Sequence, residues 1–137
     1  MLMRSLDDRT LVGGQLLASE MEELKADGVT MVVNNRPDDE EPGQPSSMEI
    51  ETAARAAGLD YRHIPVGSSG LSADGIEAMA EAIDETGGKM LAFCRSGTRS
   101  TYLWALARAR KGDDAEEIVR KAAEVGYDLT PIRPYLG

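Results

Sequence analysis

Short apolar runs alternate with longer amphipathic segments along this chain. Three apolar runs are too short for helices and are predicted to be buried strands: 29–35, 59–66 and 89–94. Apolar residues at helical spacing predict helices before and between these runs, at about 19–27, 46–57 and 72–83. Strands separated by helices of about 10 to 15 residues are typical of crossover connections. The pattern therefore predicts a parallel central sheet.

Capping residues support the predicted helix starts. Ser19 precedes Glu22 by three residues and Ser46 precedes Glu49 by the same interval, which is the spacing of a capping box. Two more helices are predicted after the last strand, from SGTRSTYLWALARARKG and DDAEEIVRKAAEVG. The expected fold is three-layer α/β, with a parallel sheet of about four to five strands flanked by helices. Residues 1–137 contain no internal repeat or linker and are expected to form a single domain.

Composition limits the partners. A chain of 137 residues with 42% hydrophobic residues can build one ordinary core. Its formal net charge of -9 disfavours nucleic acid, because binding to nucleic acid depends on neutralising phosphates with Lys and Arg. No apolar run approaches the roughly 20 residues that span a bilayer, and the start, MLMRSLDDRT, lacks the apolar core of a leader. We therefore expect a cytoplasmic protein that binds neither nucleic acid nor membrane.

The single cysteine, Cys94, ends the last apolar run in LAFCRSGTRS. One cysteine excludes an internal disulfide and a metal site built on cysteine pairs, and no metal or other cofactor is expected. The residue is either a buried filler at a strand end or a nucleophile. The Arg, Ser, Gly and Thr residues that follow favour the nucleophile, because a filler does not need them.

The residues after Cys94 are predicted to form an anion-binding loop at the carboxyl edge of the sheet, where the next helix begins. Gly97 allows positive φ, so that successive N–H groups can turn inward as a nest. Arg99 offers a planar fork to an oxyanion, and cations near a helix start favour the thiolate form of a cysteine. Cys94 and Arg99 are therefore the predicted catalytic pair. The other loop residues predicted to bind the anion are Arg95, Ser96, Gly97 and Thr98.

Two residues outside this set have alternative interpretations. Ser100 is a candidate catalytic residue that would hydrogen-bond the Cys94 sulfur, and the alternative is a plain helix N-cap. Arg36 follows a predicted strand on the same sheet edge and could bind substrate anions, or it could pair with nearby acids such as Asp38 or Glu40. The acidic run DDEEPG is interpreted either as a solvated loop or as a lid over the site.

Three motifs resemble a known family. Four residues separate Cys94 from Arg99, as in the active-site loop of rhodanese-type sulfurtransferases, whereas enzymes of the tyrosine-phosphatase type have five. Taken together, VNNRPDDEEPGQPS, HIPV and CRSGTRS resemble a family of small bacterial phosphatase-like domains, found alone or fused to β-lactamase-fold hydrolases and flavin oxidoreductases. Members are labelled phosphatases or sulfurtransferases. The resemblance implies the α/β fold of protein tyrosine and dual-specificity phosphatases rather than a true rhodanese fold.

Two features of the residues bear on the reaction. The shorter loop offers one fewer N–H to a phosphoryl group, and Gly67 and Ser68 stand where related dual-specificity enzymes carry an Asp general acid. Carboxyl groups elsewhere that could replace this acid are Asp38, Asp39 and Asp74. These features favour sulfur transfer through a Cys94 persulfide, with a small anion, thiol or persulfide as substrate. The alternatives are hydrolysis of a phosphorylated substrate through phosphocysteine, and a non-catalytic anion-binding module.

Overall fold

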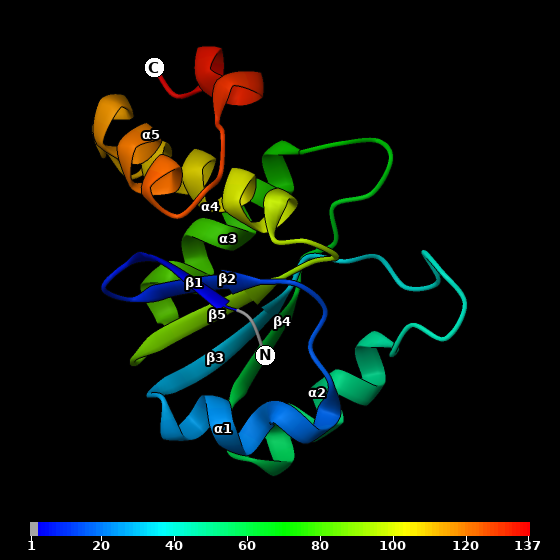
Figure 1. The fold of residues 1–137 in the computed structure, drawn as a ribbon. Coiled ribbons are helices and arrows are strands. Elements are labelled where there is room, and N and C mark those ends of the chain that lie inside the picture. Colours follow the sequence, from blue (N-terminus) through cyan, green and yellow to red (C-terminus); the bar gives the residue numbers. More distant parts are fainter. Residues whose placement is uncertain (1–2) are drawn as a thin grey trace.

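The computed structural model of the protein describes residues 3–137, and a five-stranded sheet lies at its centre (Figure 1). The strands are β1 (Met3–Asp7), β2 (Thr10–Gly13), β3 (Val29–Asn34), β4 (Asp60–His63) and β5 (Lys89–Phe93). Their order in the sheet is β1-β2-β5-β3-β4, in which β1 is antiparallel to β2 and the other neighbours are parallel. The prediction of a mainly parallel sheet is confirmed, and β5 is its central strand.

Helices cover both faces of the sheet (Figure 1). They are α1 (Met21–Ala26), α2 (Ser47–Ala56), α3 (Ala73–Glu85), α4 (Thr98–Arg110) and α5 (Ala115–Glu124), with short 3-10 helices η1 (Ala18–Glu20) and η2 (Thr130–Tyr135). Alternate residues of β5 enter separate cores, because side chains of a strand point to opposite faces. Met90 and Ala92 pack on the α3 and α4 side, whereas Leu91 and Phe93 pack on the α2 side. The three-layer prediction is also confirmed.

The hairpin formed by β1 and β2 was not predicted. Polar and charged residues dominate β1, in which Leu6 is the buried residue, so the segment contains no apolar run. An edge strand needs only one apolar face, and that pattern is weak over five residues. The pairing of β2 with β5 nevertheless matters for the site, because Gly13 lies beside Phe93 in the parallel register.

Two predicted helix starts have different outcomes. Ser46 caps α2 by accepting a hydrogen bond from the Glu49 backbone N–H at 3.1 Å, as predicted. Ser19 caps no helix, since it lies inside η1, and the Glu20 side chain instead accepts from Leu17 N at 2.7 Å.

None of the helices formed within residues 3–137 is both long and apolar enough to cross a membrane. Met1 and Leu2, which begin the segment predicted to lack a leader, lie outside the described residues.

Candidate active site

Cys94 directly follows β5 at the carboxyl edge of the parallel strands. Its backbone N–H donates to Gly13 O at 3.3 Å, while Asn35 N donates to Phe93 O at 2.8 Å on the other side. Strands on both sides therefore fix the start of the loop. The Cys94 side chain is fully buried, and α4 begins four residues later at Thr98. This edge is where open α/β sheets bind ligands, as the sequence predicted.

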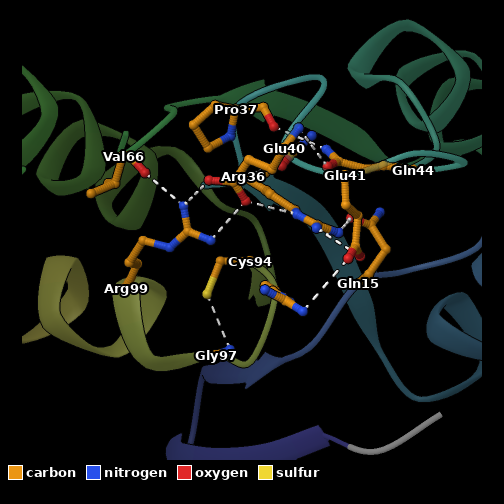
Figure 2. A network of polar contacts seen from close by, with 12 residues as sticks. Gln15, Arg36, Pro37, Glu40, Glu41, Gln44, Val66, Cys94, Gly97 and Arg99 are labelled. Carbon is orange, nitrogen blue, oxygen red and sulfur yellow. Dashed lines mark hydrogen bonds and ion pairs between the residues drawn. The ribbon is translucent and has the colours of Figure 1, made fainter. Parts of the chain in front are cut away.

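The loop of residues 94–100 turns around its sulfur atom. Gly97 has φ +91°, and its N–H donates a hydrogen bond to Cys94 Sγ at 3.1 Å (Figure 2). Gly97 also occupies the N-cap position of α4, and its carbonyl oxygen accepts hydrogen bonds from Thr101 N at 2.9 Å and Thr101 Oγ1 at 2.8 Å. The positive φ expected of Gly97 is thus present, and it turns one amide onto the sulfur.

The other loop side chains point to different partners. The hydroxyl groups of Ser96 and Thr98 lie 3.1 Å apart and hydrogen-bond to each other. Arg95 is 70% exposed, and its Nη2 lies 3.6 Å from Glu41 Oε2. No hydrogen bond joins any of these three side chains to Cys94 within the part of the chain that the structure describes. Their predicted role in anion binding therefore depends on their backbone amides or on movement of Arg95.

Arg99 lies in the first turn of α4 with its guanidinium held on two sides (Figure 2). Nη1 donates to Glu40 Oε2 at 2.7 Å and to Val66 O at 2.8 Å, and Nη2 donates to Glu40 Oε1 at 2.9 Å. The hydrogen bonds to Glu40 raise the pKa of Arg99, and the negative charge of Cys94 raises it further. The predicted pair of Cys94 and Arg99 is therefore brought together.

Arg36 is buried at the same edge, with 2% of its side chain exposed. Nε donates to Glu40 Oε1 at 2.9 Å, Nη1 to Gln15 Oε1 at 2.9 Å and Nη2 to Glu41 Oε1 at 3.0 Å. Of the two alternatives for Arg36, pairing with nearby acids is the one found. The partners are Glu40 and Glu41, whose carboxylates reach the site from an exposed loop (Figure 2).

Neither of the two roles considered for Ser100, a hydrogen bond to the Cys94 sulfur or an N-cap, is found in the structure. Ser100 is the third residue of α4 and not its N-cap, because Gly97 takes that position. Its buried hydroxyl has no hydrogen-bond partner among the described residues, Cys94 included. An unpartnered buried hydroxyl is uncommon in proteins, so Ser100 is free to bond to a group formed or bound in the loop.

The three candidate acids lie apart from these contacts. Asp38 Oδ1 accepts a hydrogen bond from Ser47 N at 2.7 Å, which ties it to the start of α2. Asp39 has φ +63°, and Asp74 is an exposed residue in the first turn of α3. No hydrogen bond or ion pair joins any of the three to Cys94 or Arg99 among residues 3–137. Over the same residues no group of three or more His, Cys, Asp and Glu side chains could hold a metal ion.

Comparison with known proteins assigns the chain to a family. The family model of the phosphatase-like domain of β-lactamase hydrolase-like proteins matches residues 2–111. The chain belongs to this family. A β-lactamase hydrolase-like protein of Agrobacterium fabrum is 36% identical over 125 residues, and one of Xylella fastidiosa is 34% identical over the same length. These matches cover 90% of the chain but 29% of each relative, so the chain spans less than a third of their length.

Solved structures confirm the fold expected of this phosphatase-like family. The crystal structure of a candidate phosphatase from Neisseria meningitidis is 32% identical, with a TM-score of 0.82, and the match covers 96% of this chain and 94% of that one. Tk-PTP, solved in its active form, has a TM-score of 0.72 at 21% identity over 98% of this chain and 92% of its own. The domain therefore has the fold of protein tyrosine and dual-specificity phosphatases, as the resemblance implied.

Sequence reasoning missed two partners of the loop. Glu40 was considered only as a partner of Arg36, yet it also binds Arg99, 59 residues away in the chain. Tyr127, whose hydroxyl donates to Ser96 O at 3.1 Å, lies beyond the predicted site altogether. Glu40 could have been suspected from its position four residues after Arg36 in a proline-bounded loop, whereas no local signal identifies Tyr127.

Proposed function

We propose that this chain is a cysteine-dependent phosphomonoester hydrolase that acts through a phosphocysteine intermediate on Cys94. The observation that carries the proposal is the placement of the buried Cys94 sulfur beside the guanidinium of Arg99, with a loop amide aimed at it. A nucleophile, a planar cation and a turned loop at a helix start are the parts that phosphoryl transfer requires. Membership in a phosphatase-like family supports phosphorus over sulfur.

The reaction runs in two displacements. The Cys94 thiolate attacks phosphorus and forms an S–P bond as the bond from phosphorus to the ester oxygen breaks; the leaving oxygen takes its proton from water or an acid. Water then attacks the same phosphorus, the S–P bond breaks, and phosphate leaves as the thiolate is restored. Arg99 and the loop amides stabilise the charge on the equatorial oxygens in both steps. Ser100, which has no partner, would donate to the thiolate as it leaves in the second step.

Sulfur transfer remains the second candidate because of the loop length. Only four residues separate Cys94 from Arg99. In that reaction the thiolate attacks the outer sulfur of a thiosulfate or persulfide donor, the donor's S–S bond breaks, and sulfite or a thiolate leaves. An acceptor thiolate then takes the outer sulfur from the Cys94 persulfide. No general acid is needed, in agreement with the lack of a carboxyl group hydrogen-bonded to the loop sulfur among the described residues.

Mass spectrometry of the trapped intermediate distinguishes these reactions. The protein is mixed with p-nitrophenyl phosphate, quenched in acid and digested, and a second sample is treated with thiosulfate. An added mass of about 80 units on Cys94 identifies phosphocysteine, and about 32 units identifies a persulfide. Turnover of the phosphate ester that is lost in Cys94→Ser supports the proposal. A persulfide without phosphate turnover overturns it, and phosphate binding with neither adduct indicates a non-catalytic module.

The substrate in this proposal is a phosphomonoester small enough to bring its phosphorus to the buried sulfur. We also propose a cytoplasmic location, on the basis of the lone free cysteine.

A further inference from the structure

The carboxylate of Glu40 bridges two guanidinium groups. Oε1 accepts from Arg36 Nε and from Arg99 Nη2, both at 2.9 Å, and Oε2 accepts from Arg99 Nη1 at 2.7 Å (Figure 2). A carboxylate on the arginine of an anion-binding loop has two opposite interpretations. It either competes with the substrate anion for the guanidinium, or it holds the guanidinium in place for that anion.

The donors of Arg99 decide between these interpretations. A guanidinium carries five N–H groups in a fixed plane. The Glu40 carboxylate accepts from one N–H of Nη1 and one N–H of Nη2, at the end of the group. Val66 O accepts from the second N–H of Nη1. A hydrogen bond with the Cys94 side chain also raises the pKa of Arg99. The Nε–H and the remaining Nη2–H are bonded to no oxygen atom of the described residues. These two lie parallel on one edge, which is the geometry that binds two oxygens of a phosphate. Glu40 therefore leaves open the edge that an anion needs.

Arg36, the other arginine bound to Glu40, is itself held by buried contacts. Arg36 is 2% exposed, and its other two donor nitrogens are taken by Gln15 and Glu41. Its backbone is fixed as well, because Arg36 N donates to Asn34 Oδ1 at 2.9 Å and Arg36 O lies 3.1 Å from His63 Nε2. A side chain fixed at all these points holds its partner in one orientation.

We propose that Glu40 is a positioning residue for Arg99, anchored by the buried Arg36, and that it presents the Nε and Nη2 edge of Arg99 to the substrate oxyanion. This proposal rests on the proposed function in one respect only: it requires that an oxyanion binds in the loop. Arg36 acts through Glu40 and does not bind the substrate, which replaces the role in substrate binding predicted for it.

A double-mutant cycle with Arg99 tests this proposal. Steady-state kinetics with p-nitrophenyl phosphate are measured for the native chain, Glu40→Gln, Arg99→Lys and the double variant. Glu40→Gln is expected to lower kcat about tenfold and to change KM less than about threefold, because hydrogen bonds to charged groups have effects of that size and the contact strengthens in the transition state. In the Arg99→Lys background the same change should lower kcat less than twofold, since its effect passes through Arg99.

A matched control removes a carboxylate elsewhere. Glu51 pairs with Arg55 on the exposed face of α2, 3.0 Å apart, so Glu51→Gln deletes an ion pair without touching the loop. It should leave kcat and KM unchanged. Thermal unfolding of each variant reports a structural loss separately from a kinetic one. A higher kcat/KM in Glu40→Gln, as a competing carboxylate would produce, overturns the proposal, and so does an equal fall in both backgrounds.

Phosphate binding separates failure of this proposal from failure of the proposed function. Calorimetry with inorganic phosphate is carried out on Cys94→Ser and on the same chain carrying Glu40→Gln. If adding Glu40→Gln to Cys94→Ser weakens phosphate binding by about threefold or more, the positioning role of Glu40 is supported. This holds even if the native protein hydrolyses no ester, in which case the proposed function alone fails. Unchanged or tighter binding overturns the positioning role, and so does the absence of any phosphate binding in the first chain.

Discussion

The hydroxyl of Tyr127 donates a hydrogen bond to the carbonyl oxygen of Ser96, 3.1 Å away. The same hydroxyl lies so close to Gly97 that a Cβ atom built on this glycine would clash with it. Tyr127 follows α5 and lies beyond residue 111, where the match to the family model ends. A C-terminal segment therefore braces the outside of the loop that carries Cys94.

Gly97→Ala is expected to destabilise the protein by about 2 to 4 kcal/mol, because it combines backbone strain at φ +91° with the Tyr127 clash. Urea unfolding measures the loss. Gly112→Ala is the matched control: this residue has φ +102°, but nothing lies within 4 Å of its Cβ position, so only the backbone strain of about 1 kcal/mol applies. Adding Tyr127→Phe to Gly97→Ala should recover part of the difference. Equal losses of stability in Gly97→Ala and Gly112→Ala would show that the clash with Tyr127 is relieved without a cost in free energy.

The elements that could be predicted are those encoded locally. Cys94 and Arg36 were placed on one edge correctly, because each follows a buried apolar run and the carboxyl ends of parallel strands meet there. The contact between Glu40 and Arg99 could not be predicted, because 59 residues separate them and no repeating pattern links them. The N-cap was wrongly offered as an alternative for Ser100, because Gly97 takes that position and Ser100 lies in the first turn of α4.

Cys94→Ser should abolish ester hydrolysis while preserving the loop. A serine oxygen can accept the hydrogen bond that Gly97 N donates to the sulfur at 3.1 Å, so the fold and phosphate affinity should change little. Loss of the nucleophile is expected to lower kcat by about 10⁴-fold or more. Activity with p-nitrophenyl phosphate and phosphate binding by calorimetry measure the two properties on one preparation. Full activity in this variant would rule out a covalent mechanism on Cys94.

Hydrolysis should depend strongly on the leaving group. No carboxyl group of residues 3–137 hydrogen-bonds to the Cys94 sulfur, and the hydrogen bonds from Arg99 lower the pKa of Glu40 to about 2, so Glu40 carries no proton to donate at neutral pH. Without an acid, expulsion of the leaving oxygen depends on its own basicity. We expect kcat/KM for p-nitrophenyl phosphate to exceed that for an alkyl phosphate by about 10³-fold or more. Rates for a series of substituted phenyl phosphates give the dependence directly.

Three substitutions test whether one of the candidate carboxyl groups acts as the general acid. Asp38→Asn, Asp39→Asn and Asp74→Asn should each leave kcat within about threefold, because no hydrogen bond or ion pair joins these residues to Cys94 or Arg99 in the described chain. Asp38→Asn should also destabilise slightly, since Asp38 Oδ1 accepts from Ser47 N at 2.7 Å and charge favours that bond. A fall of about 100-fold in one variant, greater for alkyl than for aryl esters, would identify that residue as the general acid.

Acid should remove the contribution of Glu40 to stability. Its pKa in the folded protein is about 2, below the ordinary value of 4.5, so its ion pairs with Arg99 and Arg36 stabilise the fold fully above pH 4.5. The contribution is lost as the pH falls from 4.5 through 2, because protonation then favours the unfolded chain. Urea unfolding of the native chain and Glu40→Gln should therefore differ most near pH 7 and converge as the pH approaches 2. The exposed pair of Glu51 provides the comparison, since Glu51→Gln should change the pH profile little. A difference between native and Glu40→Gln that stays constant down to pH 2 would mean that packing rather than charge accounts for the effect of Glu40.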